Sequence, residues 1–201
     1  MAKRGLLLVI SGPSGTGKGT VLNLLRQLNT GVRYSISATT RQPREGEVDG
    51  QNYFFKTVEE FEQMIKEEEL VEWVQYCGNY YGTPKKCIEE TLDRGFDVIL
   101  EIEVEGALNI KNKYPESVLI FILPPTFEEL RRRIESRGTE EPGIISQRLE
   151  KAKKEFQFIN SYDYAIVNNS LQDAVEDINS ILRAEKLKFS RNGFFPEELG
   201  I

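Results

Sequence analysis

A glycine-rich segment near the start of the chain carries the residue types that bind phosphate. It reads Gly12-Pro13-Ser14-Gly15-Thr16-Gly17-Lys18-Gly19-Thr20 and matches the pattern G-x-x-x-x-G-K. Glycines let backbone N–H groups turn inward around phosphate oxygens, and the lysine can reach the β- and γ-phosphates of a nucleotide. Ser or Thr normally follows the lysine, whereas this chain has Gly19 and then Thr20. The segment therefore predicts a nucleotide phosphate site in which Thr20, or a water molecule, contacts Mg²⁺.

A second anion site is predicted by the loop that reads Ser37-Ala38-Thr39-Thr40-Arg41-Gln42-Pro43-Arg44-Glu45-Gly46-Glu47. Arg41 and Arg44 lie three residues apart and flank a proline, which restricts the backbone of the loop. Guanidinium groups bind phosphate oxygens through two parallel hydrogen bonds. We therefore expect two phosphate groups to be bound, one by each segment.

Acidic residues end one of the apolar runs. Glu101 follows Val98-Ile99-Leu100, and Glu103 comes two residues later, which would place both side chains on one strand face. Ligands of α/β proteins bind at the carboxyl ends of parallel strands, so we expect both acids near the nucleotide, with Glu101 contacting the metal through water. The alternative is that both acids are solvated side chains at a strand end and bind nothing. Glu105 supports this alternative, because it extends the run of acidic residues.

The composition excludes several kinds of chemistry. The 201 residues contain no histidine, which rules out Ser-His-Asp triads, Cys-His pairs and H-E-x-x-H zinc sites. The two cysteines, Cys77 and Cys87, are too few for a disulfide framework or a four-ligand metal site, and they suit a reducing cytoplasm. The apolar run from Leu6 to Ile10 is too short for a signal sequence or a membrane span.

The net charge of −6 is unevenly distributed along the chain. Residues 1–55 hold seven basic and three acidic groups, whereas residues 56–110 hold five basic and fourteen acidic groups. The negative total argues against nonspecific binding of nucleic acid, but the basic first quarter suits small anions. We therefore expect a cytoplasmic protein with small-molecule substrates and with no nucleic-acid or membrane partner. The sequence leaves open whether it is a monomer or a homo-oligomer.

Alternating apolar runs and helical patterns predict the elements that position these residues. Runs at residues 6–10, 97–101, 118–122 and 164–167 are typical of buried parallel strands, and helical stripes occur at residues 21–28, 127–134, 145–159 and 171–182. The third of the strands is followed by a predicted capping box, Thr126-x-x-Glu129. This alternation predicts an α/β fold with a doubly wound parallel sheet.

Residues 39–84 interrupt that alternation. They combine a turn-rich loop, an aromatic run at residues 53–55, a helix opened by Thr57-x-x-Glu60 and strand-like runs at residues 70–74 and 78–82. We predict a small strand-rich insertion at residues 39–84 in a core made of residues 1–38 and 85–201. A polar lid segment is predicted at residues 138–147.

These motifs occur together in one order that resembles the guanylate kinases. The order is the G-x-x-x-x-G-K loop, then S-x-T-T-R-x-P-R-x-G-E, Glu72-Trp73, Gly78-Asn79-Tyr80-Tyr81-Gly82 and Arg137-Gly138-Thr139. The resemblance covers about residues 6–185. It implies a P-loop nucleoside monophosphate kinase core with a GMP-binding insertion and a mobile lid. It also implies transfer of the γ-phosphoryl group of ATP to GMP, or to dGMP, in GTP supply and GMP recycling, with Mg²⁺ carried by ATP.

The resemblance also implies a role for each matching residue. The GMP phosphate would be bound by Arg41, Arg44, Tyr53 and Tyr81, and the guanine by Ser37, Glu72 and Thr83, with Glu101 and Glu103 beside it. ATP would be bound by the Gly12–Thr20 loop together with Arg133 and Arg137. The catalytic groups would be Lys18, Arg41, Arg137 and Arg148, and Arg148 would also bind GMP. Guanine fits this set, because one carboxylate accepts from its N1–H and N2–H, while a Ser or Thr hydroxyl donates to O6. The family often has Asp where this chain has Glu101 and Glu103.

Two other functions compete with this interpretation. A guanylate-kinase-like interaction module would keep the fold without catalysis, but such modules typically have a degraded phosphate loop, and here Lys18 and the glycines are intact. A kinase for another nucleoside monophosphate would share the loop, but it does not account for Ser37, Glu72 and the arginine pair together. Some of these residues could also have no role in binding. Arg133 could lie on a solvated helix face, and Tyr53 and Tyr81 could serve only to pack the strands.

Overall fold

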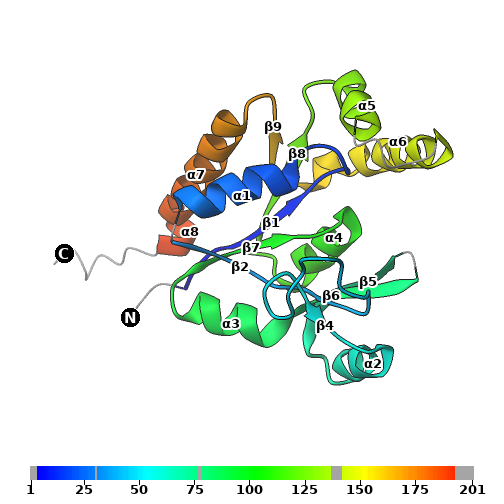
Figure 1. Cartoon of the computed structure of the whole chain (residues 1–201). Helices are drawn as coiled ribbons and strands as arrows, with labels where there is room; N and C mark the ends of the chain where they lie inside the picture. Colours follow the sequence, from blue (N-terminus) through cyan, green and yellow to red (C-terminus); the bar gives the residue numbers. More distant parts are fainter. Residues whose placement is uncertain (1–3, 30, 77, 137–141, 193–201) are drawn as a thin grey trace, which may run out of the picture.

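The computed structural model describes residues 4–29, 31–76, 78–136 and 142–192. Its central sheet has five strands in the order β2-β7-β1-β8-β9 (Figure 1). These strands are β2 (Val32–Tyr34), β7 (Asp97–Glu101), β1 (Leu7–Ser11), β8 (Val118–Leu123) and β9 (Tyr164–Val167). Every pairing between them is parallel. The predicted α/β fold with a parallel sheet is therefore confirmed.

Helices cover both faces of this sheet because the strands are apolar on both sides. Leu8 and Ile10 pack with α1 (Lys18–Leu28) and α7 (Leu171–Leu187) in one cluster. Leu7 and Val9 pack on the opposite face with α3 (Lys85–Asp93) and α4 (Val104–Lys113). β1 lies at the centre of the sheet with buried residues on both faces. This packing holds the start of the following loop in position.

A second sheet is formed by the chain between β2 and α3. Its order is β4-β3-β6-β5, with β4 (Phe54–Phe55), β3 (Ala38–Thr39), β6 (Asn79–Pro84) and β5 (Leu70–Tyr76). It is packed by α2 (Val58–Lys66) around the fully buried Phe61. Thr57 and Glu60 form the complete reciprocal capping box that the sequence predicts for this helix.

The remaining helices follow β8 and β9. They are α5 (Phe127–Glu135), α6 (Pro142–Phe156), the 3₁₀ turn η1 (Ile159–Ser161) and α8 (Phe189–Asn192). Only half of the capping box predicted for α5 is formed. Thr126 Oγ1 accepts from the N–H of Glu129 at 3.0 Å, whereas the Glu129 carboxylate binds Arg132 and Arg133. No helix in the described part of the chain is long and apolar enough to cross a membrane.

Candidate active site

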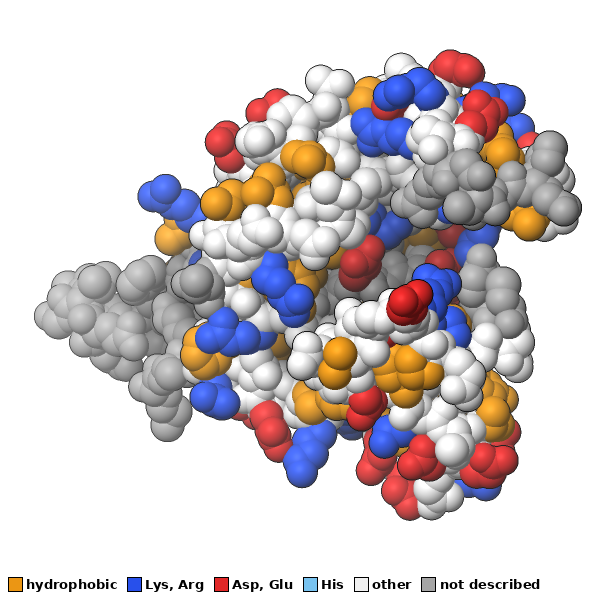
Figure 2. All heavy atoms as spheres, in the orientation of Figure 1, with side chains coloured by type: hydrophobic (Ala, Val, Ile, Leu, Met, Phe, Trp, Pro, Cys, Tyr) orange, Lys and Arg blue, Asp and Glu red, His pale blue; other side chains and the backbone are white. Residues whose placement is uncertain are grey.

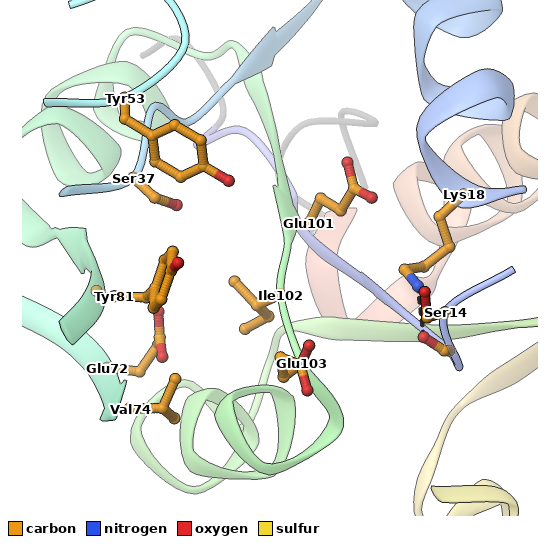
Figure 3. Close-up of a pocket in the computed structure, with 12 residues that line it drawn as sticks. Ser14, Lys18, Ser37, Tyr53, Glu72, Val74, Tyr81, Glu101, Ile102 and Glu103 are labelled. Atoms are coloured by element: carbon orange, nitrogen blue, oxygen red, sulfur yellow. Dashed lines mark hydrogen bonds between the residues drawn. The ribbon is translucent and has the colours of Figure 1, made fainter. Parts of the chain in front are cut away.

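A cavity of about 380 Å³ lies between the central sheet and the second sheet. Figure 3 shows the side chains that line it in two groups, with Lys18 and Ser14 at one end and Tyr53, Ser37, Tyr81 and Glu72 at the other. Glu101, Ile102 and Glu103 lie between the two groups. The space-filling view shows the molecule hollowed between the second sheet and α5–α6 (Figure 2). Residues predicted for both nucleotides thus line one continuous cavity.

The phosphate loop joins β1 to α1 and is held by its own backbone. Lys18 Nζ donates to the carbonyl oxygens of Gly12 and, at 3.2 Å, of Pro13, and Thr16 Oγ1 donates to Pro13 at 3.0 Å. Gly12 must be glycine, because a Cβ there would lie 2.4 Å from the carbonyl oxygen of Ile122. Burial lowers the pKa of the Lys18 ammonium, and the charge of Glu101 opposes that shift. The loop is therefore held in shape by its own hydrogen bonds, with one cation among them.

Asn168, just after β9, supports the loop from behind. Its side-chain Nδ2 donates to the carbonyl oxygen of Thr16 at 2.8 Å. Its backbone carbonyl oxygen accepts from Arg133 Nη2 at 3.2 Å. A Cβ on Gly17 would lie 2.4 Å from the same Nδ2, which is a steric clash. Gly17 also has a φ of 87°, a backbone conformation that favours glycine. Sequence reasoning missed Asn168, and no local pattern marks it.

The residues after the lysine are open on the helix surface. A Cβ on Gly19 would meet no neighbouring atom within 4 Å, and both Gly19 and Thr20 are exposed in the first turn of α1. Because position 19 has no side chain, nothing from that residue crowds the Thr20 hydroxyl. The predicted contact of Thr20 with Mg²⁺ stays a prediction.

The arginine pair is organised by a carboxylate of the same loop. Arg41 Nη2 donates to Glu47 Oε1 at 2.9 Å, and the N–H of Arg44 donates to Glu47 Oε2 at 2.7 Å. The bond from Arg41 is the main reason that the pKa of Glu47 lies below its usual range. Glu47 belongs to the sequence motif, but its role as the anion that spaces Arg41 and Arg44 appears only in the structure.

Two tyrosines and a serine surround the space beside Arg41. The Tyr53 and Tyr81 rings lie 6.3 Å apart, edge to face, and the Arg41 guanidinium carbon lies 5.3 Å from the Tyr53 ring centre. Tyr53, Tyr81 and Ser37 all line the cavity. Burial raises the pKa of the Tyr53 hydroxyl. The structure therefore brings these three predicted residues together.

Glu72 and Thr83 form a buried pair at the far end of the cavity. Glu72 is 5% exposed and Thr83 is completely buried, and Thr83 Oγ1 donates to Glu72 Oε1 at 2.6 Å. They meet because β5 and β6 pair in antiparallel register with Glu72 opposite Thr83. Burial raises the pKa of Glu72, and the hydroxyl bond opposes that rise. Glu72 lines the cavity, and a buried carboxylate in such a place is suited to accept hydrogen bonds from a polar base.

Glu101 and Glu103 lie in the middle of the cavity but not on one strand face. β7 ends at Glu101, and Glu103 is the N-cap residue of α4, so the expectation of a shared strand face is wrong. The turn between them is fixed to β1, because Ser11 Oγ donates to the carbonyl oxygen of Ile102 at 2.9 Å. Glu103 pairs with Lys151 at 2.5 Å. Desolvation raises the pKa of Glu101 although its side chain is open to the cavity, and Lys18 opposes that rise.

Two of the three predicted lid arginines reach the phosphate loop. Arg133 Nη1 donates to the carbonyl oxygen of Thr16 at 3.4 Å, and its Nε binds Glu129 at 2.8 Å. Arg148 of α6 donates from Nη2 to Ser14 Oγ at 2.5 Å. Arg137 lies outside the described residues, as do residues 138–141 of the predicted lid. Arg133 and Arg148 thus converge on the loop from different helices.

Three comparisons with known proteins point to one family. The family model described as guanylate kinase matches residues 4–185. The guanylate kinase of Halalkalibacterium halodurans is 53% identical over 94% of this chain and 93% of its own length. That of Bacillus subtilis is 52% identical over 95% of this chain and 94% of its own length. The crystal structure of guanylate kinase from Anaplasma phagocytophilum has a TM-score of 0.78 at 36% identity, covering 94% of this chain and 90% of the other. With the family model and full-length relatives in agreement, this chain belongs to the guanylate kinase family.

Proposed function

We propose that this chain transfers the γ-phosphoryl group of ATP to GMP, giving ADP and GDP, and that the residues described above perform it. The observation that carries the proposal is the single cavity lined at one end by Lys18 and at the other by Glu72. A donor nucleotide on the phosphate loop and an acceptor nucleotide on the second sheet would then direct their phosphates at each other. The intact loop favours this catalytic function over a non-catalytic interaction module.

In this proposal, Glu72 and Thr83 select the base. Glu72 accepts from N1–H and N2–H of guanine, the Ser37 hydroxyl donates to O6, and Thr83, whose one hydroxyl proton is donated to Glu72, holds that carboxylate in place. Adenine presents a different edge, which would leave the buried carboxylate without donors. Glu103, which lines the same cavity, would lie beside the base.

The phosphates are aligned by cations. Lys18, Arg133 and Arg137 would bind the ATP phosphates, and Arg41 and Arg44, with Tyr53 and Tyr81, would bind the GMP phosphate. Arg148 would be a catalytic group at the GMP side. Phosphoryl transfer depends mainly on positioning and on stabilising charge in the transition state. The acceptor is already an anionic phosphate oxygen, so no base that titrates near neutral pH is needed. The absence of histidine from the sequence is consistent with this mechanism.

Mg²⁺ would enter with ATP rather than occupy a protein site of its own. No group of three or more acidic or thiol side chains that could hold a metal occurs among the described residues. Mg²⁺ prefers phosphate and water oxygens with one or two protein oxygens. The Thr20 hydroxyl and the Glu101 carboxylate fit that preference, Glu101 through water. The ion would neutralise charge on the phosphates of bound ATP.

The larger organisation is part of the same proposal. Residues 1–38 and 85–201 would form the ATP-binding core, residues 39–84 the GMP-binding insertion, and residues 138–147 a lid. Closure of insertion and lid around both nucleotides would exclude water and limit hydrolysis of ATP. A cytoplasmic location, where ATP and GMP are available, belongs to the proposal as well.

A panel of acceptors tests the proposal. The purified protein is incubated with Mg-ATP and with GMP, dGMP, AMP or UMP, and ADP release is followed in a coupled assay. We expect rapid turnover with GMP, turnover with dGMP, and little with AMP or UMP. No stimulation by GMP would contradict the enzymatic function, and equal rates with AMP would contradict the role of Glu72. Calorimetry with each nucleotide separates binding from turnover.

A further inference from the structure

Gly106 of α4 lies against the carboxylate of Glu72. A Cβ at Gly106 would lie 2.9 Å from Glu72 Oε2, closer than the packed atoms of a folded protein allow, and 3.4 Å from Glu72 Cδ, an ordinary contact distance. Gly106 is buried, and it stands in the first turn of a helix, where its backbone is helical and needs no positive φ. Glycine is a poor helix former, so backbone conformation does not explain its presence.

The Glu72 carboxylate has little freedom to move away from Gly106. Its Oε1 is fixed by Thr83, which is itself completely buried. The backbone beside Glu72 is held by the same helix, because Lys113 Nζ donates to the carbonyl oxygen of Val71 at 2.6 Å. Lys113 follows Gly106 by seven residues, which is two turns along α4 on the same face. α4 therefore contacts β5 at two points around one side chain.

We propose that Gly106 is a positioning residue that sets the place of the Glu72 carboxylate and thereby the affinity for the acceptor base. It leaves room for Oε2, which lies against α4, while Oε1 keeps its bond to Thr83. The inference rests on the proposed role of Glu72 and adds a residue from the core that acts through it. A helix of the ATP-binding core would thus take part in base selection.

The Gly106→Ala variant tests this inference through the split between kinetic constants. The added methyl group displaces a carboxylate that makes charge-assisted hydrogen bonds, so the KM for GMP should rise at least about tenfold. The KM for ATP should stay unchanged. Alanine favours the helix, so the midpoint of thermal unfolding should be unchanged or higher, an outcome that a loss of general packing would not give.

Two further variants make the result decisive. In a Glu72→Asp background the carboxylate is one methylene shorter, so adding Gly106→Ala should raise the KM for GMP by less than about threefold, as expected for coupled residues. Asn109→Ala, an exposed position on the same helix, is the matched control and should leave both KM values unchanged.

The outcomes separate this inference from the proposed function. A raised KM for GMP in Glu72→Gln beside a normal one in Gly106→Ala would overturn the inference alone. A normal KM in Glu72→Gln would overturn the role of Glu72 itself. Equal increases in the KM values for ATP and GMP, a lower unfolding midpoint, or additive effects of Gly106→Ala and Glu72→Asp would show that Gly106 serves packing only.

Discussion

The two ends of the cavity are built in different ways. The donor end is a backbone loop at the centre of a parallel sheet, closed by hydrogen bonds to the carbonyl oxygens of Gly12, Pro13 and Thr16. The acceptor end is a set of side chains on a small sheet, two of whose strands have only two residues each. In the described part of the chain, the buried core under that sheet consists of Ala38, Phe61 and Leu70.

This difference teaches how each end achieves selectivity. Backbone N–H groups bind any phosphate, so the donor end recognises charge and shape but not the identity of a base. Side chains such as Glu72 and Thr83 recognise one pattern of donors and acceptors. Arg41 is paired with Glu47 of the same loop, so the acceptor end depends on ion pairs between side chains. We therefore expect substitutions at the donor end to reduce turnover and those at the acceptor end to change affinity and selectivity.

The largest effect is expected from Lys18→Ala at the donor end. Removal of a cation from the transferred phosphoryl group should lower kcat by about 10³-fold, while the KM for GMP changes little. The fold should stay intact, because burial disfavours the charged ammonium, as the lowered pKa of Lys18 shows, and this cost offsets its hydrogen bonds to Gly12 and Pro13. Steady-state kinetics with circular dichroism checks both points. A kcat within about tenfold of the unchanged protein would contradict the role of Lys18.

The second largest effect is expected from Glu72→Gln at the acceptor end. The amide keeps the size of the side chain but presents an N–H group where guanine needs an acceptor. The KM for GMP should therefore rise about 10²-fold, with the KM for ATP unchanged. Initial rates over a matrix of both substrates measure the two constants together. Equal changes in both would remove the distinction between the two ends.

A matched pair of smaller substitutions sharpens the comparison. Thr83→Val removes the hydroxyl that fixes Glu72, and it should raise the KM for GMP by about fivefold. Asn168→Ala removes the amide that holds Thr16, and it should raise the KM for ATP by about the same factor. Each variant is the control for the other. If either one changed the wrong substrate's KM, the assignment of that end would fail.

The smallest effect expected is a pH-dependent shift in stability. Burial raises the pKa of Glu72 above 4.5, so the folded protein is destabilised by the ionised carboxylate, and this penalty disappears as the pH falls through the raised pKa toward 4.5. Glu72→Gln should thus unfold at a temperature about 2–4 °C higher than the unchanged protein at pH 8. The difference should shrink as the pH approaches 4.5. Parallel melting curves across that range would argue against a buried charge.

The sequence predicts local features and misses the contacts between distant segments. The apolar run before Gly12 predicts β1, and Thr57 with Glu60 predicts the start of α2, because each signal lies within a few residues. β2 has no clear signal in the sequence, because it has three residues, of which only Val32 is buried. α3 begins after Pro84 without a side-chain cap, which leaves no start signal.

The candidate site follows the same rule. The loop and the arginine pair are visible as motifs, and the resemblance to a family supplies Glu72 and Thr83. Asn168 and Gly106 act on residues 152 and 34 positions away. Their importance depends on the packing of β9 behind the loop and of α4 against β5, which no single segment encodes. Such residues become evident only once the fold brings the segments together.

The preference for GMP over inosine monophosphate tests most directly the claim that Glu72 identifies the base. Inosine monophosphate lacks the N2 amino group but keeps N1–H and O6, so it offers the carboxylate one donor instead of two. The unchanged protein should favour GMP by about 10²-fold or more in kcat/KM. In Glu72→Gln the ratio should fall to within about threefold of unity, because one carboxylate oxygen is replaced by an NH₂ group, which donates and cannot accept from N2–H. A ratio that is the same in both proteins would contradict the account.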